Sequence, residues 1–156
     1  MLDGQTLVAR AVETLNELCD EVVVIGRAEV ALPPLGVAVF TDAPGPACVL
    51  NAMVTGLAAL VDDEVLVLAC DLPAAAPLLG RLMGVPLSGD AMVPTDPAGR
   101  PQPLAARYRR RETLAVGTAL LAADDRRVLA LLGHLDVALI PASAVELRNL
   151  NTPADL

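Results

Sequence analysis

The chain has 156 residues and a formal net charge of −8 at pH 7, with eleven arginines and no lysine. This length indicates one domain that is large enough to bury a hydrophobic core. An acidic chain without a basic stripe argues against nucleic acid as the main partner. It does not argue against a single nucleotide, because a divalent metal held by carboxylates can neutralise the phosphates.

Apolar residues make up 54% of the chain. Charged residues, Pro or Gly nevertheless interrupt every apolar run well before the ~20 residues that a membrane-spanning helix needs. We expect no signal peptide at the start, no membrane insertion and a cytoplasmic location. The three cysteines, Cys19, Cys48 and Cys70, are odd in number and widely spaced, which excludes a simple disulfide framework and any CxxC motif. We therefore expect buried, free thiols.

Helical and strand-like hydrophobic patterns alternate along the chain. Runs that are apolar at every position are typical of strands covered on both faces, as in a parallel sheet. The alternation with short loops predicts one α/β domain over residues 1–156, with a Rossmann-like, mostly parallel sheet and helices on both faces. In chain order we predict a helix over 6–18, strands over 22–25 and 37–40, a helix from the turn at 43–46 to about 61, a strand over 65–69, a helix from 73 to about 83, strands over 91–93 and 103–108, helices over 111–122 and 125–133, and a strand over 137–140.

Asp71 lies just beyond the predicted buried strand over 65–69, after Cys70. Ligands of open α/β sheets bind beyond the carboxyl ends of the strands. A carboxylate there can hold Mg²⁺ together with phosphate oxygens, which is the usual way this ion is bound. Alternatively, Asp71 caps the helix that follows, a common position for Asp. The residues alone leave both interpretations open.

Asp42 ends the preceding predicted strand and is followed by the turn that contains Gly45. The backbone N–H groups at the start of the next helix can meet the phosphate or sugar of a nucleotide. Asp, Pro and Gly also cluster in ordinary turns, so a purely structural role is the alternative.

Three further polar residues are candidates for binding a polar ligand. Gln102 begins a predicted strand, where its amide can recognise a base or pterin edge or can simply lie at the surface. Asn149 and Asn151 are two residues apart in a predicted extended segment and so point to the same side. Alternatively, Asn151 or Thr152 caps a short helix. We expect the arginine-rich run over 107–111 to be a solvated helix start.

The order of these features resembles the molybdenum cofactor guanylyltransferase family. Residues 70–73 resemble its Cys-Asp-x-Pro motif, and the tail over 149–156 is close to its Asn-x-Asn-Thr-Pro-x-Asp-Leu ending. The turn after Asp42, the segment from Gln102 to Tyr108 and the Arg-containing helix from Arg127 also resemble family segments. The matches extend over nearly the whole chain in the family's order.

This resemblance implies a nucleotidyltransferase with the fold of nucleotide-diphospho-sugar transferases. The implied reaction joins GMP from GTP to molybdopterin and releases pyrophosphate, with Mg²⁺ as the cofactor. The residue matching Asp71 would bind Mg²⁺ and nucleotide, and those matching Asp42 and Gly45 would contact the nucleotide. Gln102, Asn149 and Asn151 would lie by the pterin substrate.

The sequence departs from the family pattern at its start. The family begins with a strand and a Gly-Gly-x-Ser-x-Arg-Met-Gly-x-Asp-Lys loop, whereas residues 1–7 resemble the stretch that follows this loop. We therefore expect an N-terminally truncated domain that lacks a central strand and is aggregation-prone or homo-oligomeric. Whether the chain is an enzyme stays open. Three alternatives stay open. The chain is part of a guanylyltransferase whose true start lies upstream, it is a related cytidylyl- or sugar-nucleotidyltransferase, or it is a non-catalytic member of the family that binds a ligand or partner.

Overall fold

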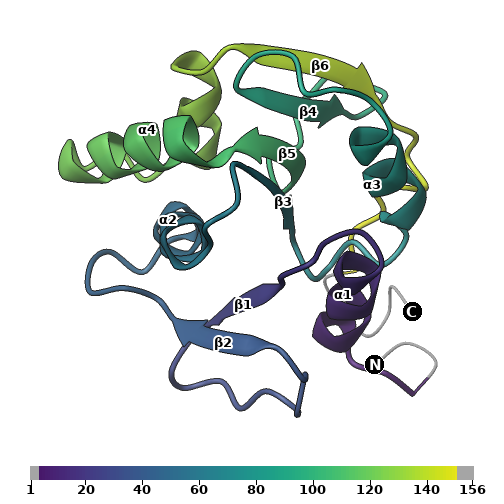
Figure 1. Cartoon of the computed structure of the whole chain (residues 1–156), viewed down its shortest axis with the longest axis vertical. Coiled ribbons are helices and arrows are strands. Elements are labelled where there is room, and N and C mark those ends of the chain that lie inside the picture. The colour runs from purple at the N-terminus through teal and green to yellow at the C-terminus, as the bar shows by residue number, and fades with distance from the viewer. Residues whose placement is uncertain (1–3, 151–156) are drawn as a thin grey trace.

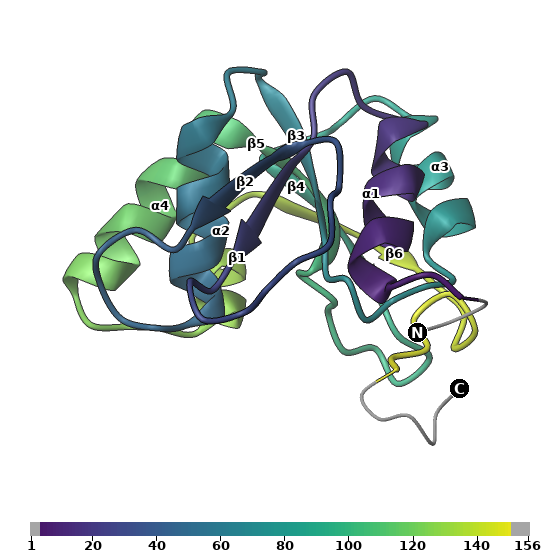
Figure 2. The same ribbon diagram turned by 90° about the horizontal axis from the view of Figure 1, so that it is seen from below.

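The computed structural model describes residues 4–150 and shows strands enclosed between two groups of helices (Figures 1 and 2). Two sheets are present in this part of the chain. In the first, β1 (Val23–Gly26) pairs in parallel with β2 (Ala38–Thr41). The second has the order β3-β5-β4-β6, with the bounds β3 (Glu64–Leu68), β4 (Ala91–Thr95), β5 (Ala105–Arg109) and β6 (Val137–Pro141).

Strand directions in the second sheet are mixed. The pair β4–β6 is parallel, with Val93 opposite Leu139, whereas β5 is antiparallel to both of its neighbours. The β5 strand runs this way because a short turn connects it to β4, which leaves no room for a crossover helix. The α/β class is confirmed, and β5 is the strand that departs from a parallel arrangement.

Helices cover both faces of the strands, as the sequence predicts. In Figure 2, α2 and α4 lie on one side of the strands, and α1 and α3 lie on the other. Each face buries aliphatic side chains: Leu50, Met53 and Leu57 of α2 form one core cluster, and the leucines of α3 form another. The bounds are α1 (Leu7–Asn16), α2 (Val49–Ala59), α3 (Ala76–Met83) and α4 (Arg110–Ala122).

The last predicted helix is wrong in type. Instead of an α-helix over 125–133, the chain forms the 3₁₀-helix η1 (Val128–Gly133). Its bonds join residues three apart, such as Ala130 N to Arg127 O at 3.0 Å. Asp124 adopts a positive φ of 58° after α4, so the chain leaves helical geometry and restarts in a segment too short for a stable α-helix.

Arg107 also corrects a prediction, because it lies in β5 and not at a solvated helix start. The residue is only 9% exposed. Its guanidinium donates to the main-chain oxygens of Leu82, at 2.7 Å, and Val85, at 2.8 Å, and forms an ion pair with Glu64. Helix α4 begins after the strand, at Arg110.

The three thiols are free, but they are not all buried. Cys19 and Cys48 are half-buried, whereas Cys70 is exposed, so the expectation of a buried thiol is wrong there. The reason is that Cys70 lies beyond the end of β3, in a turn outside the sheet. No helix over residues 4–150 combines the length and apolar character needed to cross a bilayer.

Candidate functional site

A cavity of about 440 Å³ lies beyond the carboxyl end of β3. Its volume falls within the range of pockets that bind small molecules, which is about 300–1,000 Å³. Three of the residues proposed from the sequence line it: Asp71, Gln102 and Asn149. The turn after β3, the β4–β5 connection and the segment after β6 thus bring together residues that are far apart in the sequence.

Asp71, which lines this cavity, carries an unusual side-chain atom. Its Oδ1 atom is buried and has no hydrogen-bond partner in the described part of the chain. A buried carboxylate oxygen without a partner is costly unless a cation or a donor completes its coordination. The chemistry of this oxygen therefore fits a divalent metal ion, for which carboxylate oxygen is a preferred ligand.

The alternative role of Asp71 as a helix cap is excluded by the structure. Helix α3 begins at Ala76, and the residue in its N-cap position is Ala75. Turns separate Asp71 from this helix, with Leu72 N donating to Ala69 O at 3.3 Å and Ala75 N donating to Leu72 O at 3.2 Å.

The C-terminal segment is held directly against Asp71. The main-chain N–H of Leu150 donates to the carbonyl oxygen of Asp71 at 2.9 Å. This bond explains why the neighbouring Asn149 reaches the cavity. Asn151, the second predicted asparagine, lies outside the described residues.

The connection between β4 and β5 forms another wall of the cavity and includes two residues that were not proposed from the sequence. Oδ1 of Asp96 accepts hydrogen bonds from the backbone N–H groups of Ala98 and Arg100, both at 2.9 Å, and Oδ2 accepts from Arg100 Nε at 2.8 Å. The backbone bond from Arg100 is the largest cause that lowers the pKa of Asp96. The contribution of this connection to a cavity is visible only in three dimensions.

Gln102 is fixed in this connection by its backbone. Its N–H donates to Pro94 O at 2.7 Å, and its side-chain Nε2 donates to Arg100 O at 3.3 Å. Nearby, the buried hydroxyl of Tyr108 donates to Pro103 O at 2.7 Å. Burial raises the pKa of Tyr108, so its hydroxyl stays protonated and donates throughout the neutral range.

An ion pair anchors the segment after β6, which carries Ala144 and Leu147 into the cavity wall. Glu146 pairs with Arg81 of α3 and accepts hydrogen bonds from the backbone N–H of Ser143, at 2.9 Å, and from its hydroxyl, at 2.8 Å. The bond from Arg81 is the largest cause that lowers the pKa of Glu146 to about 2.

This pair predicts a pH-dependent contribution to stability. Because the folded-state pKa of Glu146 is about 2, below its ordinary value of 4.5, the contribution is complete above pH 4.5 and lost as the pH falls toward 2. Urea unfolding of the wild type and Glu146→Gln should differ by a constant amount at neutral pH and converge near pH 2. As a control, Glu13→Gln on α1 should show no such convergence. Parallel curves for the wild type and Glu146→Gln down to pH 2 would contradict the prediction.

Asp42 and Gly45 do not line this cavity. They lie in the loop between β2 and α2, which is held by the buried Asn51: its Nδ2 donates to Ala43 O at 2.9 Å. Gly45 has a φ of 155°, and an added Cβ would lie 3.6 Å from Asn51 Oδ1. A glycine is required there by backbone geometry. Asn51 was not proposed from the sequence, because a helical Asn gives no signal of its tertiary partner.

Residues 1–139 match the MobA-like NTP transferase domain. The chain belongs to this family. A probable molybdenum cofactor guanylyltransferase of Chloroflexus aggregans is 35% identical over 164 residues, which cover 98% of this chain and 78% of the relative. The resemblance inferred from the sequence is confirmed, and the chain is a nucleotidyltransferase of the MobA-like type.

Solved structures share the fold of this MobA-like domain at low sequence identity. Molybdopterin-guanine dinucleotide biosynthesis protein A from Archaeoglobus fulgidus matches with a TM-score of 0.71 and 20% identity, covering 99% of this chain and 84% of the other. A 2-C-methyl-D-erythritol 4-phosphate cytidylyltransferase from Thermus thermophilus matches with a TM-score of 0.76 and 19% identity, covering 99% and 87%. A putative protein from Aquifex aeolicus reaches 0.79 at 20% identity, covering 94% and 79%.

In residues 4–150 of the MobA-like domain, no cluster of three or more His, Cys, Asp or Glu side chains is arranged around one metal position. A metal bound by Asp71 would therefore take most of its ligands from groups other than His, Cys, Asp and Glu side chains of these residues. Mg²⁺ commonly binds in this way, with one or two carboxylates, several waters and the phosphates of a substrate.

Proposed function

We propose that this domain transfers GMP from GTP to molybdopterin in the presence of Mg²⁺ and releases pyrophosphate. The observation that carries the proposal is that Asp71 lines a cavity at the carboxyl end of β3 and that its Oδ1 atom is buried without a partner in the described part of the chain. The name of the Chloroflexus relative supports guanine as the base and the molybdenum cofactor as the acceptor.

In the proposed reaction, a phosphate oxygen of molybdopterin attacks the α-phosphorus of GTP. A new P–O bond forms, and the bond between the α-phosphorus and the oxygen that bridges it to the β-phosphate breaks. The electron pair of the broken bond leaves with pyrophosphate. Mg²⁺, when bound, would neutralise the charge that develops on the phosphate oxygens. No covalent intermediate with the protein is required, so the protein contributes chiefly position and electrostatics.

Each wall of the cavity has a role in this proposal. The Asp71 carboxylate would hold Mg²⁺ and, through it, the nucleotide phosphates. Gln102 and Asn149 would orient the acceptor by hydrogen bonds to its pterin, with Asn151 as a further candidate. The side chains of Leu104 and Leu147 line the same cavity and would exclude water from the reacting phosphates.

Asp42 and Gly45 are proposed to contact the nucleotide from a separate position. They follow β2, and Asp71 follows β3, so all three lie beyond the carboxyl ends of their strands. This is the edge of an α/β sheet at which ligands bind. The proposal therefore places the nucleotide along this edge and the acceptor in the cavity.

Nucleotide binding and turnover test this proposal directly. Equilibrium dialysis with Mg²⁺ should show GTP binding at least about tenfold tighter than CTP, since base recognition by hydrogen bonds discriminates strongly. EDTA should abolish the binding, and molybdopterin should trigger pyrophosphate release. The variant Gln102→Ala should raise KM for the acceptor and leave the affinity for GTP unchanged. If neither nucleotide bound, the catalytic proposal would fail.

A cytidylyltransferase is the second candidate, because the fold match to the Thermus cytidylyltransferase is as close as that to the Archaeoglobus protein. Tighter binding of CTP than GTP in the same experiment would favour it. We further propose that the domain acts in the cytoplasm, where its free thiols would stay reduced.

A further inference from the structure

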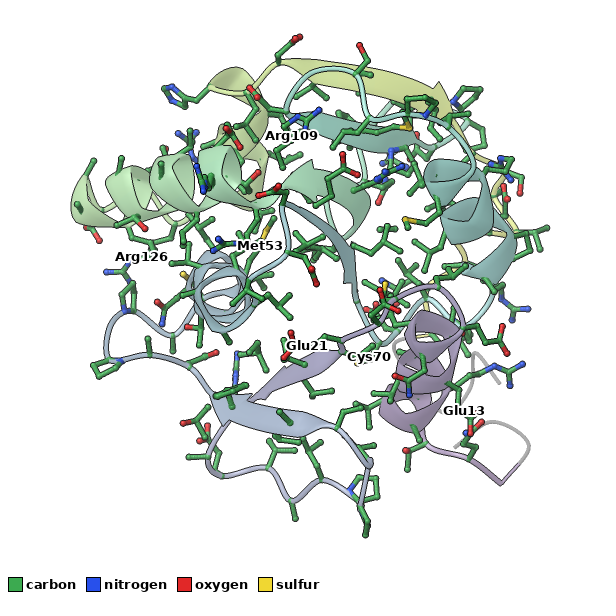
Figure 3. All side chains as sticks on the ribbon, in the orientation of Figure 1. Glu13, Glu21, Met53, Cys70, Arg109 and Arg126 are labelled. Atoms are coloured by element: carbon green, nitrogen blue, oxygen red, sulfur yellow. The ribbon has the colours of Figure 1, made fainter. Side chains whose placement is uncertain are left out.

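Helix α2 carries two polar side chains, Asn51 and Thr55, among residues that are otherwise apolar or glycine. The packing of α2 against the second sheet does not need them, because Leu50, Met53 and Leu57 supply that contact. In Figure 3, the labelled Met53 points from α2 toward the strands of this sheet. Successive residues lie about 100° apart around a helix, so Asn51 and Thr55 share the face roughly opposite Met53.

These two side chains hold the loop between β2 and α2 through one residue, Ala43. The N–H of Ala43 donates to Thr55 Oγ1 at 3.1 Å, and its carbonyl oxygen accepts from Asn51 Nδ2 at 2.9 Å. The hydroxyl of Thr55 donates to Asn51 O at 2.8 Å, which leaves its oxygen free to accept the bond from Ala43. Side chains of α2 therefore satisfy both main-chain polar groups of Ala43. We call this arrangement the Asn51–Thr55 clamp.

The loop has no comparable support from its own backbone. Over residues 4–150, no main-chain N–H or C=O of residues 43–47 bonds to another main-chain group. Ala43, Pro44 and Gly45 are exposed, so the surrounding protein does not enclose the loop. The clamp is thus the hydrogen-bonded connection between this loop and the body of the domain.

The position of Asn51 in α2 indicates that its role lies in the loop and not in the helix. The residue is only 4% exposed. A buried amide is unfavourable unless it is hydrogen-bonded, and Asn is a weaker helix former than Leu. A leucine would fill similar space in α2 without either disadvantage. The bond to Ala43 is what the asparagine adds, and this bond fixes the conformation of the loop.

The clamped residue lies between the two residues that are proposed to contact the nucleotide. Asp42 directly precedes Ala43, and Gly45 follows it by two residues. A loop that is ordered before its ligand binds loses little conformational freedom on binding, and this raises the affinity. By fixing Ala43 on both its N–H and its C=O, the clamp also restricts where Asp42 and Gly45 can lie.

We infer that Asn51 and Thr55 are positioning residues for nucleotide binding, which hold residues 42–45 in the binding conformation before the nucleotide arrives. The inference rests on the proposed function, in which Asp42 and Gly45 contact the nucleotide. The clamp acts through the loop and not on the reacting phosphates. Its loss should therefore raise Kd and KM for GTP and leave kcat at saturating GTP unchanged.

Amide exchange measured by NMR on the 156-residue chain tests the clamp in the absence of nucleotide. The N–H of Ala43 should be protected in the wild type. Thr55→Val removes the acceptor of this N–H and should speed its exchange at least about tenfold, as expected when a local contact opens. Thr55→Ser keeps a hydroxyl and should keep the protection. Exchange of Ala43 at the rate of an unstructured peptide in the wild type would overturn the inference and leave the proposed function standing.

Calorimetric titration with GTP and Mg²⁺ tests the consequence for binding. Thr55→Val and Asn51→Leu should each raise Kd about fivefold, the effect of one lost hydrogen bond. Thr55→Ser should stay within about twofold of the wild type. Thr118→Val is the matched control, because the Thr118 hydroxyl also donates to a main-chain oxygen four residues earlier, Leu114 O, at 2.8 Å but lies exposed on α4. This control should bind GTP as the wild type does.

The outcomes distinguish this inference from the proposed function. Equal affinity of the wild type, Thr55→Val and Asn51→Leu for GTP would overturn the inference alone. A fall in kcat at saturating GTP with an unchanged Kd would do the same, because the clamp would then act on the reaction and not on binding. If the wild type bound neither GTP nor CTP, the proposed function would fail and the inference would fail with it.

Discussion

The variant Asp71→Asn is expected to lower kcat/KM for Mg²⁺-dependent nucleotidyl transfer about 100-fold or more, the scale of losing one electrostatic contact to the reacting phosphates. The substitution keeps the shape of the side chain and removes the negative charge. It replaces a buried oxygen that has no partner within residues 4–150. The apparent affinity for Mg²⁺ should fall in parallel, which a metal titration of initial rates would measure.

Asp124→Asn is the matched control for this prediction. It makes the same chemical change at an exposed residue after α4, where the carboxylate pairs with the nearby Arg126 at 2.8 Å. Asn also tolerates the positive φ of this position. The control should keep wild-type rates. If Asp71→Asn kept its rate within about threefold, Asp71 would not hold the metal.

Arg107→Ala is expected to destabilise the fold by about 3 kcal/mol, the lower end of the range for breaking a buried ion pair. The substitution leaves the main-chain oxygens of Leu82 and Val85 without a donor and removes the buried partner of Glu64. We place the loss at the lower end because Glu64 is partly exposed and also lies 3.6 Å from Arg109. Urea denaturation with a common m-value would measure the change.

The neighbouring Arg111→Ala separates this effect from a general loss of positive charge. Arg111 belongs to the same arginine-rich run but is exposed at the start of α4. Its replacement should change the free energy of unfolding by no more than about 0.5 kcal/mol. Equal destabilisation by Arg107→Ala and Arg111→Ala would show that the buried contacts of Arg107 contribute nothing measurable.

The helices and strands were largely predictable because apolar residues repeat with clear periods. The strands at 22–25 and 65–69 were placed within one residue of β1 and β3. Arg107 shows the limit of this approach. An arginine becomes acceptable in this buried strand because Leu82 of α3 and Val85 in the loop after it supply carbonyl oxygens and Glu64 supplies a carboxylate, and no local pattern contains this information.

The candidate site was predictable in part. Asp71, Gln102 and Asn149 were proposed from the sequence, and the structure brings them to one cavity. Whether Asp71 caps a helix could not be decided, since this depended on where α3 begins. Pro73 indicated an earlier start than the observed one at Ala76. The cavity-lining Asp96 and Arg100 went unnoticed because a turn sequence does not reveal which surface it faces.

The hydrogen bond between Leu150 and Asp71 has a consequence for biosynthesis. Ribosomes deliver β3 and the Asp71 turn long before residues 149–150, so the carbonyl of Asp71 must remain without this partner while most of the domain is made. Strands and helices near the N-terminus can pack during elongation. The cavity wall that contains Asn149 can form only after residue 149 has been synthesised. Nascent chains stalled before residue 149 should therefore gain secondary structure without ligand binding, and the binding site should be the last part of the fold to mature.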